Sequence, residues 1–178
     1  QLLTGCRVLM NKDDDAARVR ECLDGNPQAF AAIVQRYERP LFNIALRMLR
    51  NPEDARDVTQ NVFLKAYQGL PSYDPQYKFY SWIYRMAINE SLNLLRVGRR
   101  SAGPVDDQHP SDTPGPPDLL AQDDDQRELL DALDSLKPEH RAVIVLKYFA
   151  DRSYEEAAQI LGIEEKTVKS RLFTARQA

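Results

Sequence analysis

The sequence has only two cysteines, Cys6 and Cys22, among its 178 residues. Two cysteines are too few for a disulfide framework or a zinc site, and they fit a reducing compartment. No apolar run approaches the length of about 18 residues that marks a membrane-spanning helix. The first nine residues are too short and too weakly apolar for a signal peptide, so we expect neither membrane insertion nor secretion.

Signatures of catalysis are also missing. His109 and His140 stand apart from any nucleophile, base partner or metal-ligand spacing, and no glycine-rich loop is present to cradle a phosphate. The paired acids Glu155 and Glu156 fall in the first turn of a predicted helix, where the helix dipole stabilises negative charge. We therefore predict a protein that is not an enzyme and that needs no cofactor and no metal.

What the sequence does contain is helical periodicity, and no segment shows the alternation typical of strands. Residues 13–24 predict a first helix with Asp13 to Asp15 as its N-cap, and Asn-Pro pairs at 26–27 and 51–52 predict the next two starts. We expect Pro40 to kink or break the second helix.

The third predicted helix, residues 52–68, has apolar residues on two sides, which favours a place in the middle of a bundle. Gly69 follows it as an expected C′ residue in a left-handed turn. The polar stripe of this helix, Asp57, Asn61 and Lys65 with Gln60 at its margin, is by default a solvated face.

Residues 101–122 are the predicted boundary between two domains. This segment holds five prolines, and residues 101–125 hold seven aspartates and no lysine or arginine, so the segment cannot bury enough apolar surface to fold alone. The fold class is therefore all-α, with two helical domains joined by a flexible acidic linker. The predicted divisions are an N-terminal extension (1–12), a helix bundle (13–100), the linker (101–122) and a smaller helical domain (123–178).

Residues 78–100 form the most informative stretch, an amphipathic helix with aromatic residues at its entrance and arginines at its exit. Six of the fifteen aromatic residues lie within residues 73–84. Aromatic rings stack on unpaired bases, at roughly 1–3 kcal/mol each, and cations follow a phosphate backbone. The stretch is therefore a candidate for binding single-stranded DNA, although composition alone favours core packing of the rings. The alternative is that the rings form core and the arginines complement the helix dipole.

Near the C-terminus, the spacing of Ala158, Gly162 and Val168 predicts a helix-turn-helix, because a small residue, a left-handed turn and a branched packing residue recur there. With Val168 and Leu172 facing inward, the outward and flanking side chains can read a major groove. They are Lys166, Thr167, Lys169, Ser170, Arg171, Phe173, Thr174 and Arg176. The alternative is a helical hairpin that serves protein contact.

Taken together, these motifs resemble the extracytoplasmic-function (ECF) sigma factors, the two-domain initiation subunits of bacterial RNA polymerase. Residues 57–67 are similar to their region 2.2, residues 78–96 to regions 2.3 and 2.4, and residues 153–176 to region 4.2. The resemblance covers about residues 15–178, with three motifs in the family's order and an acidic linker between them.

The resemblance implies promoter recognition together with core polymerase, and it implies a role for each motif. The helix of residues 57–67 would dock on the β′ clamp through Asp57, Gln60, Asn61, Phe63 and Lys65. The −10 element would be opened and held by Tyr77, Lys78, Phe79, Tyr80, Trp82, Arg85, Asn89, Arg96, Arg99 and Arg100. The last helix would read the −35 element through the eight side chains named above.

The implied partners are the β and β′ subunits of core polymerase, promoter DNA and an anti-sigma factor. The implied location is cytoplasmic, with attachment to the membrane only through the anti-sigma factor. Two other functions remain open on the residues alone. One is a dimeric helix-turn-helix repressor or activator that binds duplex DNA without polymerase, and the other is a helical adaptor with no DNA function.

Overall fold

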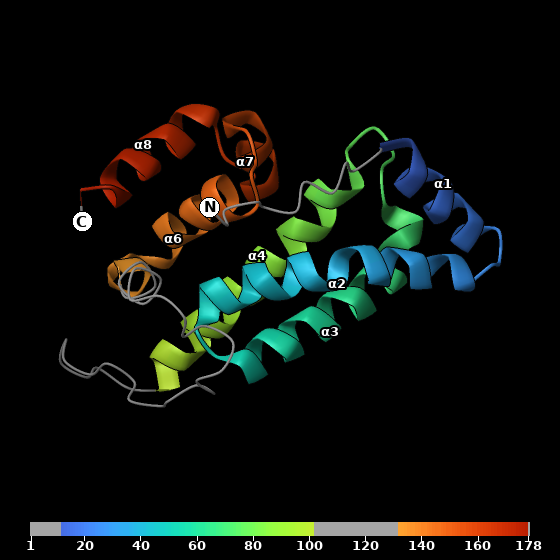
Figure 1. The fold of residues 1–178 in the computed structure, drawn as a ribbon, viewed down its shortest axis with the longest axis horizontal. Coiled ribbons are helices and arrows are strands. Elements are labelled where there is room, and N and C mark those ends of the chain that lie inside the picture. Colours follow the sequence, from blue (N-terminus) through green and yellow to red (C-terminus); the bar gives the residue numbers. More distant parts are fainter. Residues whose placement is uncertain (1–11, 102–131, 178) are drawn as a thin grey trace, which may run out of the picture.

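The computed structural model describes residues 12–101 and 132–177, and every regular element in these two ranges is helical, which confirms the all-α prediction (Figure 1). The elements are α1 (Lys12–Leu23), α2 (Gln28–Leu49), α3 (Pro52–Gly69), a 3₁₀ turn (Leu70–Ser72), α4 (Phe79–Ser101), α6 (Pro138–Ile144), a π-helical segment (Val145–Phe149), α7 (Tyr154–Leu161) and α8 (Glu165–Ala175). The predicted extension and linker lie outside the described residues, apart from Lys12 and Ser101. No helix within the two ranges is both long enough and apolar enough to cross a bilayer.

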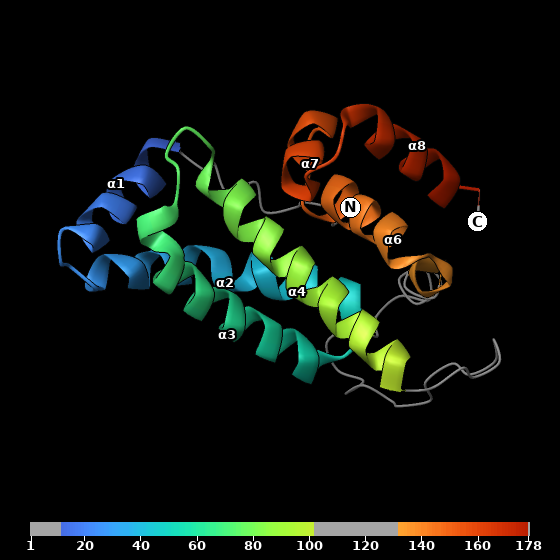
Figure 2. The same cartoon turned by 180° about the vertical axis from the view of Figure 1, so that it is seen from behind.

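Helix α2 is the centre of the N-terminal bundle, where it contacts α1, α3 and α4 (Figures 1 and 2). Its apolar stripe includes Ile33, Tyr37 and Leu41, which are all fully buried. Val62 of α3 and Ile83 of α4 are buried in the same core. Burial of these side chains is the main force that holds the bundle together.

Pro40 does not break α2, although the sequence predicts a kink or a break. The helix runs without interruption from Gln28 to Leu49 with Pro40 inside it. A proline removes one backbone hydrogen bond. The core residues Tyr37 and Leu41 on either side of it are fully buried, and their burial holds both halves of the helix in the core.

Helix α3 differs from its prediction at two points. Gly69 has a right-handed φ of −88°, so it is not the left-handed C′ residue expected from the sequence. A Cβ atom at Gly69 would lie 3.3 Å from the Trp82 ring, a tight contact that the ring could accommodate only by moving a few tenths of an ångström. The second apolar side of α3 is only partly covered, because Phe30 of α2 contacts Phe63 and Tyr67, whereas Leu64 is 57% and Tyr67 is 46% exposed. Helix α3 is therefore an outer helix of the bundle.

Asp15 is not an N-cap residue either. It lies inside α1 at 3% exposure, accepts a hydrogen bond of 2.5 Å from the Tyr37 hydroxyl, and pairs with Arg36 at 2.6 Å. Burial and this bond raise the pKa of Tyr37. The carboxylate thus ties α1 to α2, and a buried polar group satisfied in this way fixes the orientation of α1.

The C-terminal domain forms as its caps predict. The Ser153 side chain accepts the Glu156 N–H at 3.0 Å, and the Glu156 carboxylate accepts the Ser153 N–H at 2.9 Å, which completes a capping box at the start of α7. Gly162 takes the left-handed conformation with φ of +66°, and Val168 and Leu172 of α8 are buried. These features confirm the predicted helix-turn-helix geometry.

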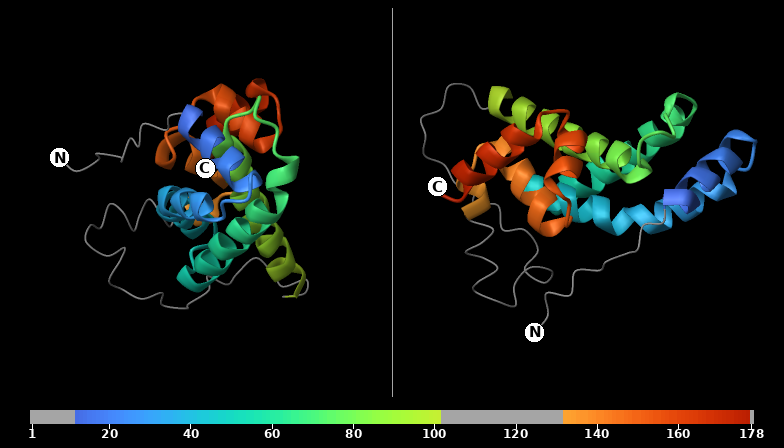
Figure 3. Two further views of the ribbon diagram at one scale, coloured as in Figure 1. Left: turned by 90° about the vertical axis from the view of Figure 1, so that its right-hand side faces the viewer. Right: turned by 90° about the horizontal axis from the view of Figure 1, so that it is seen from above.

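The two domains pack directly on one another, which the sequence does not predict. Helices α6 and α7 contact α4, and α6 and the π-helical segment contact α2 (Figures 2 and 3). Arg141 of α6 is 7% exposed and donates to the carbonyl of Met48, in the last turn of α2, at 2.8 Å. The buried residues of both domains belong to one continuous cluster.

Candidate functional site

An aromatic pocket of about 290 Å³ lies where α4 begins, beside the segment that links it to α3. Its lining residues are Ser72, Tyr73, Asp74, Tyr77, Ser81, Trp82, Arg85 and Gln159. Tyr77 is 53% exposed, and the Tyr73 and Trp82 rings lie 5.3 Å apart at an angle of 47°. A base extruded from a DNA strand could stack on these rings. The carboxylate, hydroxyl and guanidinium groups beside the rings could form hydrogen bonds with the edge of the base.

This pocket contains three of the side chains predicted to bind single-stranded DNA, Tyr77, Trp82 and Arg85. The sequence prediction missed Ser72, Asp74 and Ser81, and it counted Tyr73 only as one of the clustered aromatics. Ser72 and Asp74 are short polar residues between α3 and α4 and carry no periodic signal, and Ser81 is an ordinary polar residue in the first turn of α4, so only the folded structure reveals that they line the pocket.

Phe79 and Tyr80 are buried, and they support the core interpretation of the aromatic cluster. Phe79 is 2% exposed, with its ring 5.6 Å from that of Tyr37 and 5.5 Å from that of Trp82. Tyr80 is 6% exposed. Neither ring is open to a base in this structure, so these residues position the pocket rather than line it.

The other predicted −10 side chains lie further along α4. Asn89 is exposed and does not line the pocket. Arg96 is an exposed cation that lies 3.9 Å from Glu139 of α6. Arg99 and Arg100 fall within α4, and their side chains are outside the described part of the structure.

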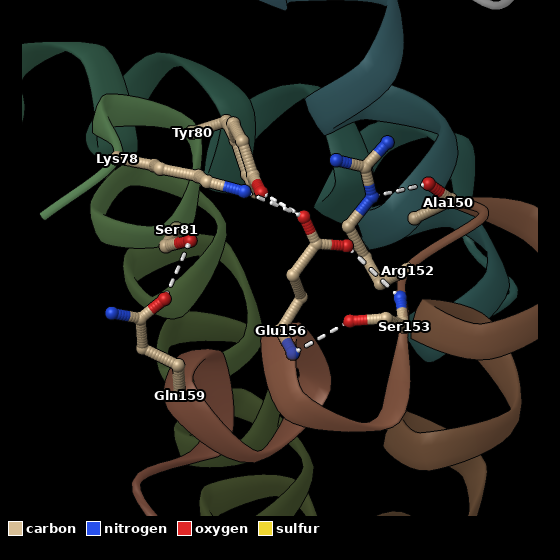
Figure 4. A network of polar contacts seen from close by, with 8 residues as sticks. All are labelled: Lys78, Tyr80, Ser81, Ala150, Arg152, Ser153, Glu156 and Gln159. Carbon is tan, nitrogen blue, oxygen red and sulfur yellow. Dashed lines mark hydrogen bonds and ion pairs between the residues drawn. The ribbon is translucent and has the colours of Figure 1, made fainter. Parts of the chain in front are cut away.

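Glu156 joins the two domains at the entrance of α4 (Figure 4). Its Oε1 atom accepts a hydrogen bond from Lys78 Nζ at 3.0 Å and a short one from the Tyr80 hydroxyl. Arg152 stacks over the Tyr80 ring at 4.7 Å. One carboxylate of α7 therefore holds two of the side chains predicted to bind DNA.

The environment of Glu156 favours its charged form. Burial alone would raise the pKa of this carboxyl, but the hydrogen bonds donated by Tyr80, the Ser153 N–H and Lys78 outweigh burial and lower the pKa to about 2. Burial and the bond to Glu156 in turn raise the pKa of Tyr80. The network is thus an ionised carboxylate held by three donors at neutral pH.

Arg85 reaches the other end of the same helix. Its Nε donates to the carbonyl of Ile160 at 3.1 Å, and its Nη2 donates to the carbonyl of Gln159. Both carbonyls belong to the last turn of α7, where the helix dipole is negative. Ser81 Oγ and Gln159 Oε1, 3.4 Å apart, complete the contact.

The outer face of α8 is open. Phe173 is 64% exposed, Lys166 and Ser170 are exposed, and Val168 and Leu172 face the core as predicted. Not every predicted side chain on this helix is unengaged. Lys169 pairs with Glu165 at 2.6 Å, and the Thr174 hydroxyl donates to the carbonyl of Ser170 at 3.1 Å. Arg176 donates to the Tyr148 hydroxyl.

A groove of about 340 Å³ lies between α3 and α4, lined by Asp54, Asp57, Val58, Asn61, Glu90, Asn93, Leu94 and Val97. Asp57 and Asn61 face it as the polar stripe predicts, Gln60 is exposed, and Lys65 pairs with Glu90 at 2.5 Å. Phe63 is half-buried against Phe30. Exposed Leu94 and Val97 of α4 give this groove an apolar component that the sequence prediction missed, and Leu64 of α3 is also exposed.

Comparison with known proteins gives a consistent result. A family model described as Sigma-70 region 2 matches residues 33–101, and one described as Sigma-70, region 4 matches residues 126–178. The chain is 30% identical to the ECF RNA polymerase sigma factor SigW of Bacillus subtilis, over 90% of this chain and 92% of that protein. It is also 30% identical to the ECF RNA polymerase sigma-E factor of Escherichia coli K12, over 92% of this chain and 91% of that protein. The solved structure of CnrH in complex with the cytosolic domain of CnrY aligns with a TM-score of 0.70 at 26% identity, over 93% of this chain and 94% of that chain.

The Glu156 network predicts a measurable pKa change. Tyr80→Phe removes one donor, so the pKa of Glu156 should rise from about 2 toward its ordinary value near 4.5. Because the folded pKa is depressed, ionised Glu156 stabilises the domain contact above pH 4.5, and this contribution is lost as the pH falls toward 2. Carboxyl carbon chemical shifts followed by NMR across this range measure the change. Tyr84→Phe is the control, and an equal shift in both variants would refute the assigned hydrogen bond.

Proposed function

Since the chain belongs to the extracytoplasmic-function (ECF) sigma factors, non-enzymatic initiation factors that direct core RNA polymerase to promoters, we propose that it captures the melted −10 element in the pocket beside Trp82. The observation that carries this proposal is the pocket itself, where the Tyr73, Tyr77 and Trp82 rings meet the Arg85 guanidinium. An extruded base stacks on such rings while the cation holds an adjacent phosphate. Because binding there favours the open strand over the duplex, it also promotes melting.

The −35 element is assigned to α8 in the same proposal. In a helix-turn-helix the second helix lies in the major groove, and the exposed side chains of α8 include cations, hydroxyls and an aromatic ring. Lys166 and Ser170 are the strongest polar candidates because their side chains are exposed, whereas Lys169, Thr174 and Arg176 bind residues of their own domain. Phe173, at 64% exposure, is a candidate for contact with a thymine methyl group.

Core polymerase is assigned to the outer surface of α3. Asp57, Gln60 and Asn61 are exposed on it beside Leu64, and this mixture of polar and apolar side chains is typical of a protein interface. Phe63 is packed on Phe30 and supports the helix from beneath. Lys65 is engaged by Glu90, so it acts through that pair.

An anti-sigma factor is the proposed regulatory partner. Support comes from CnrH, which is 26% identical to this chain and whose solved structure holds it in complex with the cytosolic domain of CnrY. A protein of that kind would bind this chain and keep it from core polymerase.

Reconstituted transcription tests the function directly. The chain, bacterial core polymerase and a pool of promoter fragments should give run-off transcripts whose sequenced starts share two short motifs at a fixed spacing, since two domains of one chain read two elements. Core polymerase alone is the control. Duplex binding without polymerase, together with no chain-dependent transcripts, would favour the repressor function instead.

Replacement of Trp82 tests the capture pocket. Trp82→Ala should lower promoter opening by roughly tenfold or more, since it removes a stacking surface, and should leave core binding in a pull-down unchanged. Permanganate reactivity of unpaired thymines measures opening. Trp82→Phe retains a ring and should restore most of it; unchanged opening in Trp82→Ala would exclude the pocket as the capture site.

Charge reversal on α3 tests polymerase docking. Asp57→Lys should weaken binding to core polymerase by roughly tenfold, because the groove beside α4 loses a carboxylate that faces the partner. Glu38→Lys, at an exposed position of α2, is the matched control. Equal retention of both variants in a titrated pull-down would show that the polar stripe of α3 is a solvated face and does not bind polymerase.

A further inference from the structure

We infer that Asp74 selects the base that enters the capture pocket, the aromatic pocket of about 290 Å³ beside Trp82, and that it favours a base with an exocyclic amino group over thymine. The inference rests on the proposed function, since it concerns the base that this pocket would hold. Adenine, cytosine and guanine each carry an amino group that can donate to a carboxylate, whereas thymine carries carbonyl oxygens and no amino group. The pocket is then a selective site and not only a stacking surface.

The hydroxyl groups between α3 and α4 already donate their protons within the protein. The Tyr73 hydroxyl donates to the carbonyl of Tyr77 at 2.6 Å, and the Ser72 hydroxyl donates to the carbonyl of Gly69 at 2.8 Å. A hydroxyl has one proton and two lone pairs, so each of these groups offers a ligand an acceptor. This side of the pocket is therefore rich in acceptors.

On the other side of the pocket, the donors of α4 point toward α7. Arg85 donates to the carbonyls of Gln159 and Ile160, and Ser81 Oγ lies 3.4 Å from Gln159 Oε1 (Figure 4). Tyr77 and Gln159 also carry donors, which can serve the carbonyl oxygen or ring nitrogen beside an amino group. The amino group itself needs an acceptor, and the strongest acceptor in the lining is a carboxylate.

Asp74 supplies that carboxylate, and its loop holds it in place. Asp74 is exposed, its Oδ1 accepts the Gln76 N–H at 2.9 Å, and its carbonyl accepts the Tyr77 N–H at 3.1 Å. A carboxylate offers about four acceptor positions. The side chain is thus fixed by one hydrogen bond and can still accept another from a ligand.

The negative charge of Asp74 has no use in the loop or in backbone binding. An asparagine side chain forms the same bond to a backbone N–H two residues on, so the turn with Gln76 does not require a charge. A carboxylate also repels the phosphates that the cations of a DNA-binding surface attract. A base edge does account for the charge, because aspartate and glutamate are the side chains that accept from the amino group of cytosine.

Asp74→Asn tests the inference, because asparagine retains the turn and loses the charge. The chain in complex with bacterial core polymerase is mixed with single-stranded oligonucleotides of randomised central sequence, and the bound molecules are sequenced and aligned. With the unaltered chain, thymine should be depleted at one position by roughly fivefold or more. Asp74→Asn should lose this depletion and keep the preferences at the other positions. Asp24→Asn, an exposed aspartate that follows α1, is the matched control and should keep both.

Paired probes then isolate the amino group. The selected oligonucleotide is labelled and made with the selected base or with its analogue that lacks the amino group, which is uracil for cytosine and hypoxanthine for adenine or guanine. Fluorescence anisotropy should show that loss of the amino group weakens binding at least about fivefold for the unaltered complex and less than about twofold for Asp74→Asn. Equal weakening in both complexes would overturn the inference. A uniform loss of binding by Asp74→Asn for every base would also overturn it, since Asp74 would then only shape the loop.

Failure of base selection can be told apart from failure of the proposed function. In the run-off assay, the unaltered chain has to start transcripts if it directs polymerase to promoters. A chain that starts transcripts, but whose base preference is the same with and without the Asp74 charge, refutes base selection alone. A chain that neither starts transcripts nor binds the oligonucleotides refutes the proposed function, and base selection falls with it.

Discussion

Tyr37 of α2 is fully buried between the rings of Phe79 and Tyr84 of α4, and its hydroxyl is bonded to Asp15 of α1. This contact fixes the rotation of α4 about its own axis, because an aromatic ring packed on two sides tolerates little movement. The rotation in turn decides which α4 side chains face outward. Trp82 and Arg85 reach the capture pocket because Phe79 and Ile83 are held in the core.

The two domains are also linked through helix ends. Arg85 binds the last carbonyls of α7, and Arg141 binds the carbonyl of Met48 near the end of α2. Each domain therefore supplies a cation to the negative end of a helix in the other. These polar contacts lie beside a buried apolar cluster that is continuous between the two domains, so the domain contact is part polar and part apolar.

Several features followed from local sequence patterns and are confirmed. The capping box of Ser153 and Glu156, the left-handed turn at Gly162 and the Asn51 cap of α3 each depend on residues within a few positions of one another. Where a prediction failed, a distant residue was responsible. Gly69 lies in close contact with the ring of Trp82 and has an ordinary right-handed backbone angle, and Asp15 is held by Tyr37 and Arg36 instead of capping α1.

By itself, the sequence determined the all-α class, the helix-turn-helix and the resemblance to ECF sigma factors, because periodicity, caps and motifs are local properties of the chain. Only the tertiary structure decided which aromatic rings line a pocket and which are buried, since Trp82 and Phe79 look alike in a pattern but differ in what packs on them. It also decided that Glu156, a helix cap in the sequence, holds Lys78 and Tyr80 of the other domain. That contact joins residues almost eighty positions apart, and no local rule relates them.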